Sequence, residues 1–292
     1  MNPAHTLAAT VADKITLPVV YQDIRKLISR SEATIDDFVD VISLDSTLSL
    51  RIKKIANSPF FGHSRKAETV GQAITMLGMF QIHDLLVSSL AIRAFSTISA
   101  DIFNQQAFWR SCVYCGILAR MLAQKCMLPA KERLFTAGLL HEIGHIVMFS
   151  KIPENMQEIL IESQKNNKPV YLLEREALGF DYGEVGYEIM QLWHLPESYG
   201  AIAKFHITPK QAKEHEIEAQ IVNIARSIML DEELGIEQSA ALYLNANSLI
   251  RDMVTVQDVN NMKINARSHV DDVMDCLWPF AKEMSLSGNY KK

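Results

Sequence analysis

The segment His141-Glu142-Ile143-Gly144-His145 brings two histidines and a glutamate close together, a combination that can bind a metal ion and activate water. On one continuous helix, His141 and His145 would lie one turn apart on the same face, as two zinc ligands do, with Glu142 placed as a general base. A zinc peptidase of this kind needs a third ligand downstream, but no histidine recurs until His194. Glu162 or Glu174 could be proposed, but neither lies in a supporting motif. A zinc peptidase is therefore the weakest of three functional hypotheses.

Length, composition and charge limit the class of protein. The 292 residues, 48% of them hydrophobic, suffice for one large or two modest domains with a buried core. The 34 acidic and 29 basic residues give a net charge of −5, which disfavours nonspecific attraction to a phosphate backbone, so we expect no nucleic-acid partner. No apolar run approaches the roughly 18 residues of a membrane span, and no signal peptide is evident. We expect a cytoplasmic protein without membrane association.

The secondary structure around this segment and along the rest of the chain is predicted to be helical. Apolar residues recur at helical spacing along almost the whole chain, and no run alternates strictly between apolar and polar. This pattern predicts an all-α fold. In the first block we expect helices over residues 19–30, 34–43, 46–57, 70–78 and 80–96. Thr34 and Ser46 are predicted to cap two of them, because their hydroxyls can accept unsatisfied backbone N–H groups.

Three of the four cysteines follow a helical stripe rather than a metal-binding pattern. Cys112, Cys115 and Cys126 share an apolar face with Phe108 and Leu122 in the first helix of a second block. Buried cysteine behaves as a small hydrophobic residue, so we expect reduced core thiols and no zinc or redox site there. After about residue 210 the chain becomes more polar and contains no recognisable chemical motif.

Other polar groups are interpreted as solvated helix surface, since charged side chains populate exposed positions for solubility alone. These groups are a possible basic patch, Arg25, Lys26, Arg51, Lys53 and Lys54, and the His83-Asp84 dipeptide.

The flanks of His141 resemble the helix that carries the His-Asp pair in the HD metal-dependent phosphohydrolase superfamily. Further segments resemble one branch of it, the HDOD (HD-related output domain) proteins of bacterial signalling. The segments that carry the resemblance, in order, are Leu17-Pro18, Leu44-Asp45-Ser46-Thr47-Leu48, Ile55-Ala56-Asn57-Ser58-Pro59-Phe60-Phe61-Gly62, Ala73-Ile74, Leu77-Gly78, Phe108-Trp109-Arg110, Ala137-Gly138-Leu139-Leu140-His141, Glu174-Arg175, Val185-Gly186 and Trp193-His194-Leu195-Pro196. His194 stands where the family often has glycine, so we expect it to form a turn.

The resemblance implies an N-terminal helical bundle packed on an HD-like helical bundle, with a C-terminal helical extension. We expect an HDOD domain over residues 14–210, divided into an N-terminal helical subdomain at about 14–100 and an HD-like subdomain at 104–210. The extension would then cover residues 211–292.

The resemblance also implies the position of a degenerate metal site. In catalytic HD enzymes an early His, a His-Asp pair, further histidines and a late Asp bind metals that activate water against a phosphoester. Carried onto this sequence, the early His is Ser111, the pair is His141 and Glu142, the downstream His is Tyr182, the later His-His pair is Phe205-His206, and the late Asp is Arg226. A guanidinium cannot ligate a metal, and its charge opposes a divalent cation. We therefore expect no catalytic residues, no tightly bound metal and no other cofactor.

These observations leave two main hypotheses about function. The favoured one is a non-catalytic bacterial signal-transduction or regulatory protein, whose metal-less HD-like core binds a signalling protein or a small regulatory ligand. The alternative is a metal-dependent phosphohydrolase with an unusual ligand set of His141, Glu142, His145 and His206, using Mn, Mg, Fe, Ni or Zn. Under the favoured hypothesis, His141 is a satisfied core histidine. Because a buried carboxylate without a metal needs a cation, we predict that the Arg226 guanidinium forks over both oxygens of Glu142.

Overall fold

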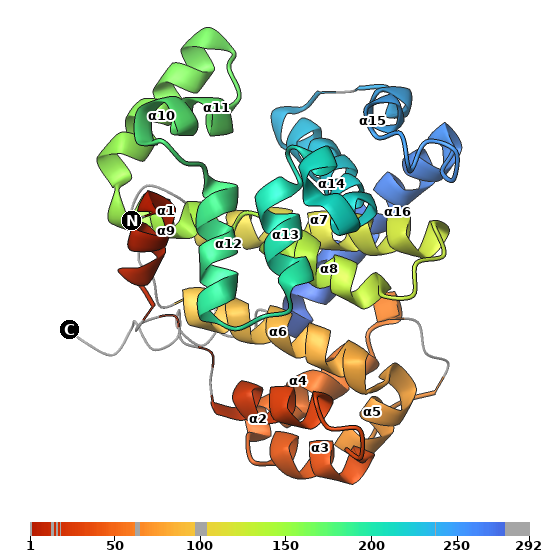
Figure 1. Ribbon diagram of the computed structural model, residues 1–292. Coiled ribbons are helices and arrows are strands. Elements are labelled where there is room, and N and C mark those ends of the chain that lie inside the picture. The colour runs from red at the N-terminus through yellow and green to blue at the C-terminus, as the bar shows by residue number, and fades with distance from the viewer. Residues whose placement is uncertain are drawn as a thin grey trace, which may run out of the picture. The chain divides into compact units, whose positions relative to one another are not determined.

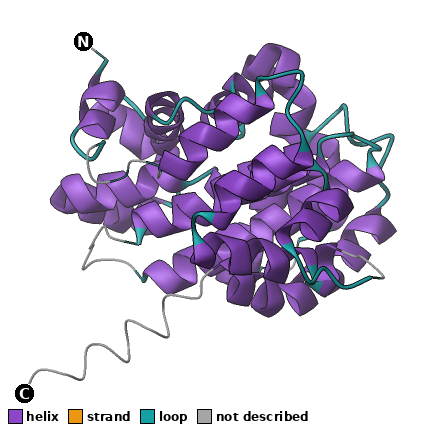
Figure 2. Cartoon of the chain, turned by 90° about the horizontal axis from the view of Figure 1, so that it is seen from below, coloured by secondary structure: helices purple, strands orange, loops and turns teal. Residues whose placement is uncertain are grey.

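The computed structural model describes residues 2–12, 15, 17, 19–61, 65–96, 104–236 and 238–277. In this part of the chain every regular element is a helix, joined to the next by a loop or turn (Figures 1 and 2). The all-α prediction is confirmed. Pro18 and Gly62, which belong to the N-terminal motifs, lie outside the described residues.

The chain forms two compact units whose limits differ from the predicted subdomains. The large unit comprises Met1–Thr16 and Ala94–Ile264, and the small unit comprises Leu17–Arg93 and Asn265–Lys292. The first helix, α1 (Pro3–Ala9), belongs to the large unit because it packs on α12 (Tyr182–Leu192) and α9 (Ile143–Lys151). The predicted C-terminal extension is shared between the two units, since the unit boundary falls within its last helix, α16 (Val256–Leu277).

The small unit contains the helices predicted for the first block, except for the last two residues of the final helix, and their ends lie within two residues of the predicted ones. They are α2 (Val19–Ile28), α3 (Ile35–Ser43), α4 (Ser46–Ala56), α5 (Val70–Leu77) and α6 (Met79–Phe95), with a short 3-10 helix, η1 (Pro59–Phe61). Thr34 caps α3 in a capping box with Asp37, as predicted. Ser46 is not a cap. Asp45 caps α4, where its carboxylate, a stronger acceptor than a hydroxyl, accepts a hydrogen bond from Leu48 N at 2.9 Å.

Two interpretations of polar residues in the small unit are wrong. His83 and Asp84 are buried, and His83 Nδ1 lies 3.1 Å from Asp84 Oδ1. Arg51 is also buried, and its guanidinium donates to the hydroxyl and to the carbonyl of Ser89. Each of these groups has a polar partner inside the protein, which is the condition under which burial of a charged or polar side chain is tolerated.

The large unit contains the predicted second block and most of the extension. Its other helices are α7 (Gln105–Lys125), α8 (Lys131–Leu140), α10 (Pro153–Asn166), α11 (Val170–Leu178), α13 (Glu197–Phe205), η2 (Pro209–His215), α14 (Glu216–Leu234) and α15 (Ala240–Ala246). Helix α7 packs on α8 and α14, and α12 packs on α13 and α9 (Figure 1). Cys112, Cys115 and Cys126 are buried and free on α7 and directly after it, as predicted. Burial raises the pKa of all three thiols.

The His-Glu-Ile-Gly-His segment does not lie on one helix. Helix α8 ends at Leu140, His141 is its C-cap, and Glu142 is the residue before α9. His141 and His145 consequently belong to different helices, so the premise of the zinc-peptidase hypothesis is wrong. The break lets α9 leave α8 in a new direction and pack on α12.

Gly144 permits the close approach of α9 to α12. A Cβ atom at Gly144 would lie 1.9 Å from Tyr182 O and 2.9 Å from Gly186 N. Because real Cβ atoms do not approach backbone atoms so closely, any larger residue at this position would force the two helices apart.

No single helix in the described ranges is long and apolar enough to cross a membrane. Helices α5 and α6 pass that test only as a pair, and they are bent by 110° at the break between them.

We predict that Gly144→Ala destabilises the protein by more than about 2 kcal/mol, because the added methyl overlaps the α12 backbone. Gly186→Ala is the matched control on the facing helix, where a Cβ would meet its nearest neighbour, Ala203 Cβ, at 3.7 Å. Urea unfolding followed by circular dichroism measures both changes. Equal stabilities of the two variants would contradict a tight contact at Gly144.

Candidate functional site

His141 lies at the end of α8 with one ring nitrogen bonded and the other unpaired. Its Nδ1 donates to Gly138 O at 2.6 Å, because a carbonyl can only accept. Nε2 then carries the lone pair; it is buried 3.7 Å from Glu142 Oε1 and has no hydrogen-bond partner within the described part of the chain. Burial lowers the pKa of His141 to about 4, so the ring is neutral at pH 7.

His206, at the end of α13, is also neutral and has both ring nitrogens bonded. Nδ1 donates to Ala203 O at 2.8 Å, which leaves Nε2 to accept the Tyr182 hydroxyl, also at 2.8 Å. The His206 ring meets the His141 ring edge to face, with centroids 5.1 Å apart. Burial has the largest effect on the His206 pKa, and the neighbouring His141 and Arg226 add to it. Together they hold this pKa well below its ordinary value.

Arg226 on α14 forms the predicted contact with Glu142. Its Nε lies 3.2 Å from Glu142 Oε1, with side chains 17% and 12% exposed, respectively. This is one hydrogen bond and not the two-oxygen fork expected from the sequence. The guanidinium also lies over the Tyr182 ring, with its carbon 5.7 Å from the centroid.

The Glu142 carboxylate is ionised because of its neighbours. Burial by itself would raise its pKa, but His141, which is protonated at the low pH where this carboxyl titrates, and then Arg226 oppose that effect and lower the pKa to about 2. Since the His141 ring is neutral at pH 7, Arg226 is the cation in direct contact that balances the carboxylate. The contact therefore has the electrostatic role that a bound cation would have.

Glu174 on α11 is a site residue that the sequence analysis did not place among the HD-like site positions. It is fully buried, its Oε1 lies 3.0 Å from His145 Nε2, and its Oε2 accepts Tyr182 N–H at 3.0 Å. The His145 ring stacks on Tyr182 with centroids 3.9 Å apart. Burial disfavours the charged ring, but Glu174 outweighs it, so the His145 pKa is raised. The Glu174-Arg175 motif was the available signal, but its spacing does not show which side chains it contacts.

Two of the residues carried over from the family take no part in this cluster. The Ser111 hydroxyl donates to Glu233, and Phe205 is half-buried with the Lys204 ammonium 5.6 Å from its ring centroid. His194, after α12, has a φ of +53°, in the left-handed region. That conformation suits the expected turn and explains why glycine is favoured there.

The cluster formed by His141, Glu142, Tyr182, His206 and Arg226 does not fit a divalent metal. His141 Nε2 has a free lone pair, but the nearest carboxylate oxygen already accepts from Arg226, and His206 Nε2 already accepts from Tyr182. Among the described residues, no group of three or more His, Cys, Asp or Glu side chains is placed to hold a metal ion. A stable protein site generally needs three ligands or more, and a fixed cation beside it works against a second one.

We predict that Arg226→Met destabilises the protein by about 2 kcal/mol, because it leaves Glu142 without a cation. This value lies between the ~3–5 kcal/mol lost by breaking a fully buried pair and the ~1 kcal/mol of an exposed pair. In a double-mutant cycle, Arg226→Met with Glu142→Gln should cost less than the sum of the two single changes, as measured by urea unfolding. Additive losses would contradict a coupled pair.

We predict that His141 makes the protein less stable as the pH falls from 6.5 to about 4. The folded-state pKa of about 4 lies below the ordinary 6.5, so the unfolded chain binds the proton first and the stabilisation present above pH 6.5 is lost. The shift corresponds to roughly 3 kcal/mol. His206 acts in the same direction, and His145, whose pKa is raised, acts in the opposite one.

His141→Asn, which cannot titrate, should give a flatter plot of unfolding free energy against pH over this window. The comparison uses slopes, so a uniform loss of stability in the variant does not affect it. Parallel curves for the two proteins would show that His141 does not control this pH dependence.

Comparisons with known proteins agree with this architecture. A crystal structure of an HDOD domain protein of unknown function from Geobacter sulfurreducens is similar over 91% of this chain and 97% of its own, at 19% identity and a TM-score of 0.75. A proposed phosphohydrolase from Shewanella amazonensis SB2B is similar over 93% and 98%, at 21% identity and a TM-score of 0.73. These identities show a common fold alone.

A sequence relative and a family model extend the comparison. An uncharacterized protein of Treponema pallidum (strain Nichols) is 27% identical over 241 residues, which are 80% of this chain and 46% of that protein. The chain thus spans about half the length of this relative. The model of the HDOD domain matches residues 15–209, with limits close to the expected 14–210. With its fold, its motif order and this match over most of its length, the chain belongs to the HDOD domain family.

Proposed function

We propose that this protein is a non-catalytic signal-transduction or regulatory protein, in which the HD-like large unit binds a signalling protein or a small ligand. The observation that carries the proposal is the Arg226–Glu142 contact at 3.2 Å. It places a fixed positive charge on the carboxylate that the family resemblance makes a metal ligand. A hydrolase of this superfamily needs that carboxylate for a metal.

The neighbouring side chains support the same proposal. The Tyr182 hydroxyl satisfies His206, and Glu174 satisfies both His145 and the Tyr182 backbone N–H. In these hydrogen bonds, lone pairs that a metal would need are already used by partners within the protein. The cluster also connects α11, α12, α13 and α14 to the break between α8 and α9. A rigid junction of this kind suits a scaffold that presents a binding surface.

One observation favours the alternative, a metal-dependent phosphohydrolase. His141 Nε2 is buried, unpaired among the described residues and near a carboxylate, as a metal ligand would be. For hydrolysis, Arg226 would have to leave Glu142, and at least one further donor would have to join His141.

Metal analysis and a hydrolysis assay distinguish the two proposals. We expect the full chain, after chelation and dialysis, to retain far less than one divalent ion per molecule. It should also hydrolyse bis(p-nitrophenyl) phosphate no faster than a protein-free blank with added Mn²⁺. One tightly bound ion per chain, together with Mn²⁺-dependent hydrolysis that His141→Ala abolishes, would overturn the non-catalytic proposal.

A revertant variant supplies the positive control. Ser111→His with Arg226→Asp restores two family ligands and removes the opposing charge, so we expect tighter Mn²⁺ binding than in the parent protein, measured by calorimetry. Circular dichroism establishes that the variant is folded. If the folded variant binds Mn²⁺ no better than the parent, Arg226 is not what prevents metal binding.

A further inference from the structure

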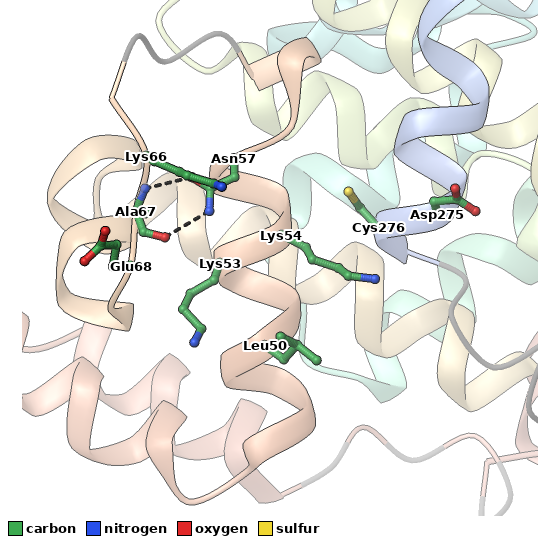
Figure 3. A pocket seen from close by; sticks show the side chains of 9 residues that line it. All are labelled: Leu50, Lys53, Lys54, Asn57, Lys66, Ala67, Glu68, Asp275 and Cys276. Carbon is green, nitrogen blue, oxygen red and sulfur yellow. Dashed lines mark hydrogen bonds between the residues drawn. The ribbon is translucent and has the colours of Figure 1, made fainter.

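The small unit contains a pocket that the proposed function does not use. Its volume is about 460 Å³, within the range of small-molecule sites (Figure 3). The lining comes from α4, from the segment ahead of α5, and from the end of α16. The lining residues are Leu50, Lys53, Lys54, Asn57, Lys66, Ala67, Glu68, Asp275 and Cys276.

Three lysine ammonium groups line this pocket, and none has a carboxylate partner among the residues that the structure describes. Lys53 is half-buried, and Lys54 and Lys66 are exposed. Among the described residues none of the three forms an ion pair, whereas Lys26 of the same unit lies 3.0 Å from Asp23. In Figure 3 the Lys54 side chain extends from α4 toward the end of α16. The lining therefore carries three positive and two negative side chains, none of which forms an ion pair among the described residues.

The wall that carries Lys66 is held in place by side-chain hydrogen bonds. Asn57 Nδ2 donates to Ala67 O at 2.9 Å, and Asn57 Oδ1 accepts from Ala67 N at 2.7 Å, the two dashed lines of Figure 3. Gln72 Oε1 accepts from Glu68 N at 2.7 Å. Because these bonds fix the backbone on both sides of Ala67, the site is pre-organised, which lowers the entropic cost of binding a ligand.

The chemistry of the lining selects a class of ligand. Lysine ammonium groups are compact point charges that bind phosphate oxygens. Glu68 and Asp275 would repel a bare phosphate, but carboxylates accept hydrogen bonds from hydroxyl groups, as they do from ribose in dinucleotide sites. Leu50 and Cys276 add apolar surface, since burial raises the pKa of the Cys276 thiol to about 11 and keeps it neutral.

We propose that this pocket binds a small phosphorylated and hydroxyl-rich molecule, of the class of sugar phosphates and mononucleotides. The lysines contact the phosphate, and the carboxylates accept the hydroxyl groups. The proposal uses no residue of the His141 cluster, so either proposal can fail without the other.

Calorimetric titration of the full chain tests the proposal with four probes: ribose 5-phosphate, adenosine 5′-monophosphate, inorganic phosphate and ribose. We expect at least one of the first two to bind about tenfold more tightly than either of the last two, because it contacts lysines and carboxylates together. Tighter binding of the nucleotide would show that the base contributes as well. No binding of either phosphorylated probe at about 1 mM would overturn the proposal.

Matched substitutions locate the binding. Lys53→Met and Lys66→Met should each weaken binding of the phosphorylated probe about tenfold. Lys26→Met, which removes a lysine outside the pocket, should leave it unchanged. Equal weakening by all three variants would indicate a general charge effect and overturn the site.

The carboxylates distinguish a built site from a simple cluster of lysines. Glu68→Gln with Asp275→Asn should weaken binding of the sugar phosphate and strengthen binding of inorganic phosphate. If this double variant binds both probes more tightly, the carboxylates only repel the ligand, and the assigned ligand class is wrong.

Discussion

The protonation pattern of the polar cluster in the large unit depends on the contact between Arg226 and Glu142. A carboxylate at a helix junction with little access to water must have a partner of opposite charge, and the guanidinium at 3.2 Å is that partner. The same fixed cation, together with burial, disfavours protonation of His141 and His206. Both rings consequently remain neutral, and the His206 ring can accept the Tyr182 hydroxyl.

The backbone around this ion pair is constrained by a helix break and by a close contact between two helices. The break between α8 and α9 places His141 at the end of one helix and Glu142 just before the next, so two adjacent side chains leave the chain at a change of direction. Gly144 then allows α9 to contact the α12 backbone at Tyr182. A residue with a Cβ at position 144 would move Tyr182 away from His145, and the two rings stack on each other. The electrostatics of the site therefore depend on a backbone contact that one residue permits.

The sequence predicted the helices of the small unit because apolar residues recur there at helical spacing. It predicted the partner of Glu142 because a buried charge without a partner is costly. It did not predict what depends on tertiary packing. Apolar neighbours on α6 did not reveal that His83 is buried as well, and the motif His-Glu-Ile-Gly-His conceals a helix break. Glu174 acts through contacts that cross 29 residues to His145 and eight to Tyr182, and no local pattern encodes them.

The polar cluster of the large unit and the pocket of the small unit differ in whether their charged side chains form ion pairs. In the large unit Arg226 neutralises Glu142, and their ion pair connects α14 to the residue before α9. In the pocket of the small unit, which Glu68 and Asp275 also line, Lys53 and Lys66 form no ion pair among the described residues. Exposed charges that the fold does not pair retain their attraction for a ligand. The net charge of −5 disfavours an extended polyanion, but it does not prevent a local cationic pocket from binding a small one.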